Sequence, residues 1–252
     1  MMKKNMALLL QYDGSRYDGW QRQGNTANTI QGKLEDVLER MTGRYQEVHG
    51  SGRTDAGVHA MGQVANVHLE TEMGDGEIRD YLNRYLPEDI LVLKAKEVPQ
   101  RFHSRLQARE KTYTYWVETG QRCPVFQRKY ITVLGECLDA AAMEEAASCL
   151  KGTHDFTSFC TAQGKKKSPV RTIKEIRIVP HGSQLEFVFL GDGFLYNMVR
   201  ILAGTLIEVG QGKRTPGSVA GTMEARNRQE AGYTAPAKGL FLARVSYDPE
   251  IF

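Results

Sequence analysis

GSGRTDAGVHA, residues 50–60, is the stretch around which the rest of the chain is organised. Three glycines and two small residues surround one arginine, one threonine and the carboxylate of Asp55. Glycine at this density lets the backbone adopt positive φ and come close to a bound group. Residues 45–50 and 63–69 read as strands on either side, so we expect Asp55 on a loop held by a rigid scaffold, where chemistry concentrates. The alternative is a turn whose aspartate bonds its own backbone.

Outward from this loop, the first half of the chain alternates strand and helix patterns. Asn28 is a candidate helix N-cap, and apolar residues then recur on one helical face until Gly43. A second helix, residues 77–86, stops before Pro87. The predicted strands are residues 6–12, 45–50, 63–69 and 90–98. The resulting order, β-α-β-β-α-β, is the ferredoxin-like unit.

The second half repeats this order. A helix capped by Asp139 runs to about residue 150, and a second helix covers residues 194–209. The predicted strands are residues 111–118, 172–179, 184–190 and 240–247. We therefore predict an α+β fold in which two ferredoxin-like halves, residues 1–107 and 108–252, join into one mixed, mainly antiparallel sheet. The cleft between the halves is the expected place for a site.

Composition indicates a soluble globular protein. Charged residues make up 25% and hydrophobic residues 41% of the 252 positions. The apolar run at residues 6–10 is too short for a signal peptide, and no stretch approaches the roughly 20 apolar residues that span a bilayer. The four cysteines form no C-x-x-C pair, which fits free thiols in a reducing cytoplasm.

The charge is unevenly distributed, although the net value is only +3. Arg101, Arg105, Arg109 and Lys111 cluster in one segment, and residues 165–167 are three lysines. A run of charged residues usually forms a face exposed to solvent. We expect no more than this of the three lysines when they are considered by themselves. Together with the Asp55 loop, the basic segment favours a phosphate-binding groove.

The sequence does not match the motifs that bind common cofactors. The third glycine after Gly50 and Gly52 falls at Gly57, which breaks the dinucleotide pattern G-x-G-x-x-G. In residues 210–214, Arg214 stands where a phosphate-binding loop needs Ser or Thr. The six histidines are scattered without paired ligand spacing. We expect neither a metal nor an organic cofactor.

The stretch at residues 50–60 resembles the catalytic loop of the TruA-type tRNA pseudouridine synthases. Further segments are similar to that family in the same order along nearly the whole chain, with Asp18 and Ser104 as small departures. These segments are residues 12–14, 19–23, 102–105, 111–115, 193–200 and 239–240. The resemblance implies the same two-unit architecture and an isomerase that converts uridine to pseudouridine at positions 38, 39 and 40 in the anticodon stem-loop of tRNAs. It also implies a homodimer.

The resemblance assigns Asp55 as the nucleophile, and the sequence leaves open whether it attacks C1′ or C6 or deprotonates the sugar. A desolvated carboxylate needs a cation to stay ionised, and Arg200, near the start of a helix in the second half, is the candidate. Its alternative role is a structural ion pair. Tyr113 is the candidate for stacking on the flipped uracil and moving the C5 proton, although tyrosines in strands are commonly core residues.

Arginines are the remaining candidates. Arg53 is expected to fill the space that the flipped uridine leaves, or else to form a salt bridge near the loop. Arg22, Arg105 and Arg109 are assigned to phosphate contacts. His59 invites a general-base role, but after a Gly-Val pair we expect it to bond backbone and hold the loop.

Two other classes compete with the isomerase. An RNA-binding module of the RRM type would show an aromatic RNP1 run such as Arg-Gly-Phe-Gly-Phe-Val, which this sequence lacks. A glycosidase or nucleoside hydrolase would usually need a second carboxylate as general acid, and the loop offers Asp55 alone. Free uracil after reaction would favour the hydrolase.

Overall fold

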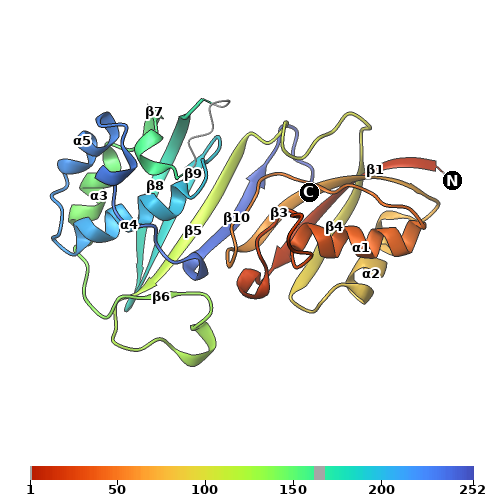
Figure 1. Ribbon diagram of the computed structural model, residues 1–252, viewed down its shortest axis with the longest axis horizontal. Coiled ribbons are helices and arrows are strands. Elements are labelled where there is room, and N and C mark those ends of the chain that lie inside the picture. Colours follow the sequence, from red (N-terminus) through yellow and green to blue (C-terminus); the bar gives the residue numbers. More distant parts are fainter. Residues whose placement is uncertain (1, 162–167) are drawn as a thin grey trace. The chain divides into compact units, whose positions relative to one another are not determined.

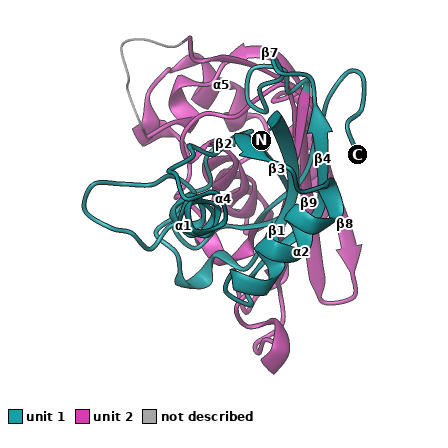
Figure 2. Cartoon of the chain, turned by 90° about the vertical axis from the view of Figure 1, so that its right-hand side faces the viewer, with its two compact units in different colours: residues 1–109, 241–252 teal, residues 110–240 magenta. Residues whose placement is uncertain are grey.

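The computed structural model describes residues 2–161 and 168–252, and these form two compact units. Unit 1 comprises residues 1–109 and 241–252, and unit 2 comprises residues 110–240 (Figure 2). The predicted basic loop at residues 165–167 lies outside the described residues.

Unit 1 is built on a sheet of strands in the order β4-β1-β3-β10, with the short β2 paired to β3. β1 is antiparallel to both β3 and β4, whereas β10 is parallel to β3. Figure 1 shows α1 and α2 on one face of this sheet. The elements are β1 (Met2–Tyr12), α1 (Ile30–Thr42), β2 (His49–Gly50), β3 (His59–Thr71), α2 (Asp75–Tyr85), β4 (Ile90–Val98) and β10 (Leu240–Ser246). The predicted order β-α-β-β-α-β is confirmed for residues 2–98.

The bounds of α1 and β2 differ from the prediction for local reasons. Thr29, not Asn28, caps α1, because its side chain accepts from the N–H of Gly32, while the Asn28 amide donates to the backbone O of Arg16 at 2.5 Å. The helix ends as expected at Gly43, whose φ is 72°. The strand predicted over residues 45–50 is paired only at residues 49–50, because those two alone form ladder bonds with β3.

Unit 2 is built on antiparallel strands in the order β5-β9-β8-β7, with β6 parallel to β5. The elements are β5 (Glu110–Glu118), β6 (Thr132–Val133), α3 (Ala140–Ser148), β7 (Gly152–Asp155), β8 (Val170–His181), β9 (Gln184–Gly191), α4 (Met198–Gly210) and α5 (Ser218–Glu224). With mostly antiparallel sheets and helices in both units, the α+β class is confirmed.

The helices of unit 2 follow the predicted apolar spacing. Asp139 caps α3 as expected, accepting from the N–H of Ala142 at 3.0 Å. The second helix begins at Met198 rather than at residue 194, because Asn197 takes a left-handed conformation with φ of 59°. Almost every residue of α4 is buried, which makes this helix the core of unit 2. The short elements β6, β7 and α5 were not predicted.

The end of the chain belongs to unit 1, which differs from the predicted division at residues 107 and 108. β10 pairs with β3, with Phe241 opposite His59 and Leu242 opposite Ala60. This strand therefore continues the sheet that carries the Asp55 loop, and residues 241–252 pack with it.

No helix in residues 2–161 and 168–252 is long and apolar enough to cross a membrane. Across the same residues, no group of three or more His, Cys, Asp or Glu side chains is placed to hold a metal ion.

Candidate active site

Asp55 lies on the loop that joins β2 to β3, as predicted. The N–H of Val58 donates to the backbone O of Asp55 at 3.1 Å and closes a turn. Gly57, third in this turn, has a φ of 76°, a conformation that glycine adopts without strain. Asp55 is half-buried, and Arg53 is exposed. The turn thus shapes the loop through the main chain of Asp55.

The first segment that holds the loop is residues 12–20, between β1 and α1. The N–H of Trp20 donates to the backbone O of Thr54 at 3.0 Å. The phenol of Tyr12 lies 2.8 Å from the Thr54 hydroxyl, and both side chains are buried. Burial raises the pKa of Tyr12 well above its usual value, so the phenol stays protonated, and either hydroxyl can donate in this bond. Thr54, the neighbour of Asp55, is therefore held at both its main chain and its side chain.

Glycines allow these two segments to touch. A Cβ on Gly14 would lie 2.0 Å from the backbone O of Val58, and one on Gly19 would lie 2.7 Å from that of Thr54. A Cβ on Gly50 would lie 2.5 Å from the Trp20 ring. Backbone atoms cannot give way as a flexible side chain does, so residues 12–20 and the Asp55 loop fit each other without spare room.

His59 fixes the same junction, at the first residue of β3. Its Nδ1 accepts from the N–H of Gly14 at 3.0 Å and lies 3.2 Å from a carboxylate oxygen of Asp13. The ring is buried and stacks on Phe241 of β10, with centroids 4.7 Å apart. The prediction that His59 bonds backbone and holds the loop is confirmed.

Gln63 of β3 supports the loop from the other side. Its Oε1 accepts from the hydroxyl of Ser51 at 2.6 Å, and its Nε2 donates to the backbone O of Gly52 at 3.0 Å. The N–H of Ser51 donates to the backbone O of Val64 at 2.7 Å. Gln63 and Ser51 are both fully buried, so the bond between their side chains does not compete with water.

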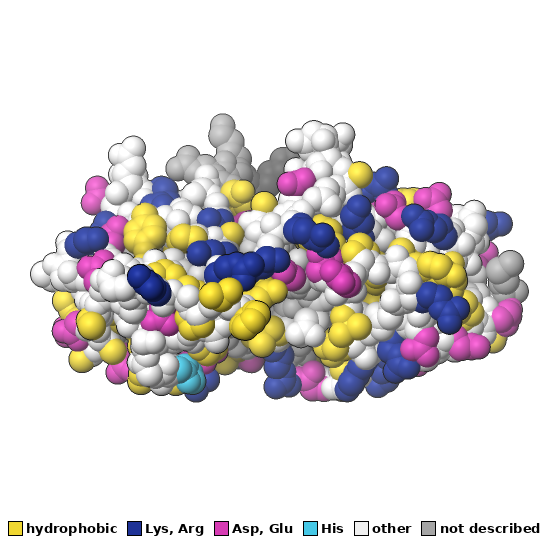
Figure 3. Space-filling model, turned by 90° about the horizontal axis from the view of Figure 1, so that it is seen from below, with side chains coloured by type: hydrophobic (Ala, Val, Ile, Leu, Met, Phe, Trp, Pro, Cys, Tyr) yellow, Lys and Arg dark blue, Asp and Glu magenta, His cyan; other side chains and the backbone are white. Residues whose placement is uncertain are grey.

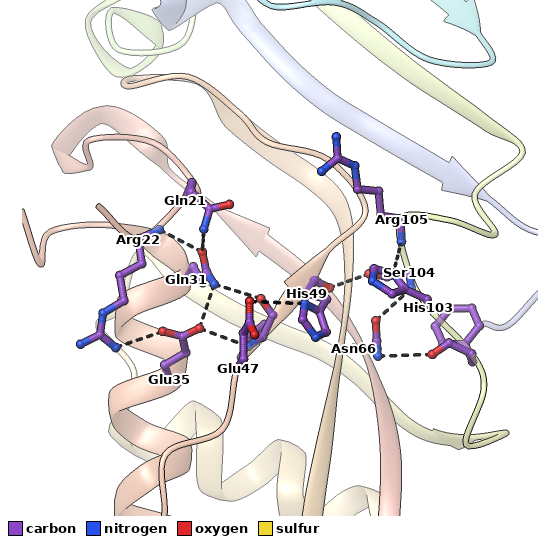
Figure 4. A network of polar contacts seen from close by, with 12 residues as sticks. Gln21, Arg22, Gln31, Glu35, Glu47, His49, Asn66, His103, Ser104 and Arg105 are labelled. Carbon is purple, nitrogen blue, oxygen red and sulfur yellow. Dashed lines mark hydrogen bonds and ion pairs between the residues drawn. The ribbon is translucent and has the colours of Figure 1, made fainter. Parts of the chain in front are cut away.

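Arg22, a predicted phosphate contact, has an internal partner. Its Nη1 donates to Glu35 at 3.1 Å, and its guanidinium lies 5.6 Å from the ring centroid of Tyr45. Glu35 is completely buried and also accepts from the Gln31 amide and from the N–H of Val48 (Figure 4). About half of the Arg22 side chain remains exposed. Arg22 thus balances a buried carboxylate, a role that sequence spacing did not indicate.

Arg105 extends from a second polar cluster in Figure 4. Ser104 donates from its hydroxyl to the backbone O of His49 at 2.5 Å and from its N–H to Asn66 at 2.9 Å. The His103 ring stacks on His49 at 5.0 Å, and burial lowers the pKa of His103, with the positive charge of Arg105 acting in the same direction. Arg105 itself is exposed, as is Arg109. Ser104, which differs from the residue expected in the resembling family, therefore links His49 and Asn66 through hydrogen bonds.

Unit 2 carries the other two candidates on regular elements. Tyr113 lies on β5 opposite Phe189, is buried, and meets the Phe194 ring edge-on at 5.2 Å. Arg200 lies in the first turn of α4, where its Nε donates to the backbone O of Ala235 at 2.7 Å and its Nη1 to Asn197 at 3.0 Å. The predicted ion pair of Arg200 with Asp55 joins the two units and stays a prediction.

Comparison with known proteins decides the family. The model of the tRNA pseudouridine synthases matches residues 8–106 and 146–248. The chain belongs to the tRNA pseudouridine synthase family. The matched ranges include Asp55, Arg53 and Arg200, whereas Tyr113 and Arg109 lie between them. The predicted family is therefore confirmed, and the individual roles of these residues stay predictions.

Relatives of this family cover nearly the full chain. A tRNA pseudouridine synthase A from Bacillus sp. (strain KSM-64) is 49% identical over 243 residues, 96% of this chain and 99% of that protein. A tRNA pseudouridine synthase A from Clostridium kluyveri is 45% identical over 244 residues, 97% of this chain and 100% of that protein. A chain in a crystal structure of a Cbf5-Nop10-Gar1 complex aligns with a TM-score of 0.37 at 12% identity, covering 80% of this chain and 45% of that one.

Sequence reasoning gave His59 a role in holding the loop, but it gave none to Tyr12 or Gln63. Tyr12 belongs to a segment that resembles the family's opening, but its bond to Thr54 spans 42 positions. Gln63 read only as part of an alternating strand. The available signal was the glycine content of residues 14–19, which indicates close backbone approach without naming the partner.

Proposed function

We propose that the protein converts uridine to pseudouridine in tRNA, at positions 38, 39 and 40 of the anticodon stem-loop, with Asp55 as the nucleophile. Membership of the tRNA pseudouridine synthase family supports the reaction and the substrate. The observation that carries the role of Asp55 is its placement, half-buried on a loop held by buried bonds through Thr54, Ser51 and His59. A reacting carboxylate needs such fixed geometry.

The reaction is an isomerisation in which atoms balance without a co-reactant. The bond between N1 of uracil and C1′ of the ribose breaks, the uracil turns, and C5 bonds to C1′. The proton leaves C5, and N1 ends with a proton. Asp55 assists by attack on C1′ or C6 or by deprotonating the sugar, and the three routes share the need for an ionised carboxylate. Nothing is oxidised or hydrolysed.

Other residues take supporting roles in this proposal. Arg200 keeps Asp55 ionised, aided by the N-terminus of α4. Tyr113 stacks on the flipped uracil and helps to move the C5 proton. Arg53 is exposed on the loop, which suits entry into the stem where the uridine was. Arg105 and Arg109 are exposed and suit phosphate contacts, and Arg22 offers phosphate the exposed part of its guanidinium.

The same proposal includes the oligomeric state of the protein and its cellular compartment. A homodimer acting on one tRNA in the cytoplasm follows from the family resemblance, and light scattering of the purified protein tests the oligomeric state.

Tritium release from an unmodified tRNA transcript labelled at C5 of uridine tests the reaction and Asp55 together. We expect release by the wild type without added cofactor, with pseudouridine mapping to positions 38–40. Asp55→Asn lowers the rate at least about 10³-fold, as for loss of other enzyme nucleophiles. Asp80→Asn, which changes an exposed carboxylate on α2, is the matched control and keeps the wild-type rate.

Three outcomes contradict the proposal. Free uracil in the product would make the protein a hydrolase. Tight tRNA binding by both the wild type and Asp55→Asn without tritium release would make the loop a recognition element. Pseudouridine elsewhere in the tRNA would overturn the assignment to the anticodon stem-loop.

A further inference from the structure

A projecting segment of unit 2, residues 119–131, has no role in the site described above. This segment, the arm, leaves the end of β5 and returns through β6, and it is the loop at the bottom of Figure 1 next to the β6 label. It lies between the two ranges that the family model matches.

Hydrogen bonds fix the base of the arm. The N–H of Thr119 donates to the backbone O of Ser183 at 2.9 Å. The Gln184 amide donates to Gln127 at 2.5 Å, and the Gln121 amide to the backbone O of Gly135 at 2.7 Å. The arm is therefore held in shape by both β9 and the segment that follows β6.

The tip of the arm presents hydrophobic side chains to solvent. Val125 and Phe126 lie in a short 3-10 turn, η2 (Val125–Gln127), and are 67% and 92% exposed. The N–H of Gln127 donates to the backbone O of Pro124 at 2.9 Å, and the Arg128 guanidinium donates to that of Val125 at 2.6 Å. A single exposed hydrophobic residue is ordinary, but a ring held outward by a hydrogen-bonded turn is available for stacking.

The arm is also strongly cationic. Arg122, Arg128 and Lys129 are exposed, and residues 119–131 contain no Asp or Glu. These 13 residues therefore carry a charge of +3, equal to the net charge of the whole chain. Figure 3 views the molecule from below, and the Lys and Arg side chains seen there lie among hydrophobic and acidic ones. The charge favours an anionic partner.

We propose that the arm binds unpaired nucleotides of the tRNA substrate other than the reacting uridine. Phe126 stacks on an exposed base, and Arg122 and Lys129 contact neighbouring phosphates. Aromatic rings between cations are the general means by which proteins hold single-stranded nucleic acid. The charge of the arm favours RNA over a second copy of the chain as the occupant, because the phosphates of RNA are anionic whereas the chain as a whole carries +3. The proposal rests on the proposed function for the identity of the RNA.

Substitutions at Phe126 test the stacking. With an unmodified tRNA transcript and fluorescence anisotropy, Phe126→Ala weakens binding about tenfold. Phe126→Leu is as weak as Phe126→Ala, because leucine keeps the apolar surface without a π face, and Phe126→Trp binds as the wild type does. The KM for tRNA rises by the same factor, while kcat at saturating tRNA is unchanged. Tyr85→Ala on α2, another exposed aromatic, is the control and leaves binding unchanged.

Substitution of the arm cations tests the phosphate contacts. The double variant Arg122→Gln/Lys129→Gln lowers the slope of log Kd against log salt by about 1 to 2, as expected for two lost phosphate contacts. Arg40→Gln/Lys94→Gln removes two exposed charges from unit 1 and leaves the slope unchanged. Arg128 is left in place because it holds the turn through Val125.

Different results overturn the two proposals. If Phe126→Leu binds as the wild type does, or if the arm cations do not change the salt slope, the arm does not bind RNA. If Phe126→Ala halves the particle mass in light scattering and leaves tRNA affinity unchanged, the occupant is a second copy. If the wild type binds tRNA and forms no pseudouridine, the proposed function fails, while the arm variants still report on binding.

Discussion

The Asp55 loop and the arm are both connections next to strands, and they are built in opposite ways. The Asp55 loop is held along its length, with Thr54 and Ser51 bonded to buried partners and no room for a Cβ on Gly14 or Gly19. The arm is bonded at its base and at its turn, and its tip faces solvent. A reacting group needs a fixed position, whereas a group that grips RNA needs access.

Among the changes that test this comparison, the largest effect is expected from filling the contact at Gly14. Gly14→Ala places a Cβ against the backbone O of Val58, which must then move together with the Asp55 loop. We expect a loss of about 2 kcal/mol or more in the free energy of unfolding and about a 100-fold lower kcat. Gly24→Ala, where no atom lies within 4 Å of the added Cβ, is the control in urea unfolding and in tritium release. Equal behaviour of the two variants would mean that the junction is not tight.

A smaller effect is expected from the bond between Tyr12 and Thr54. Tyr12→Phe leaves a buried hydroxyl without this partner, and we expect about tenfold lower kcat with an unchanged KM for tRNA. Thr54→Val has a similar effect, Thr54→Ser restores most of the rate, and the double variant Tyr12→Phe/Thr54→Val is no worse than either single variant. Additive losses in this cycle would show that the two side chains act separately.

The smallest effect on catalysis is expected from Arg22, which sharpens the contrast with the arm. Arg22→Ala leaves the buried Glu35 without its cation, and we expect the free energy of unfolding to fall by about 1–2 kcal/mol while kcat changes less than about twofold. Arg122→Ala on the arm leaves thermal unfolding unchanged. If both variants melt as the wild type does, the ion pair between Arg22 and Glu35 does not stabilise unit 1.

The sequence predicted most of the secondary structure because apolar periodicity is a local signal. The amphipathic face of α1 and the alternation in β3 predicted the elements of unit 1 in order. The errors in the predicted secondary structure fall where a short segment or a single residue determines the bounds of an element. β7 has four residues and no pattern of its own, and the left-handed Asn197 delays the start of α4. The pairing of β10 with β3 joins segments about 180 positions apart, which no local pattern encodes.

The candidate site was predicted in part for the same reason. Asp55 stands in a motif of consecutive residues, so its loop was found from the sequence. The partners of that loop, Tyr12 and Gln63, are brought to it by the sheet. The ion pair of Arg22 with Glu35 was not predicted, because the burial of Glu35 depends on how α1 packs.

The place of β10 bears on how the protein is made at the ribosome. Translation proceeds from the N-terminus, so all of unit 2 has been synthesised before Phe241 exists. Phe241 packs on His59, and Leu242 pairs with Ala60, directly after the Asp55 loop. The nascent chain therefore completes the support of this loop only after the whole of unit 2 has been made. A chain that stops before Phe241 lacks the ring that packs on His59 and the partner of Ala60, so its Asp55 loop has less support than that of the longer chain.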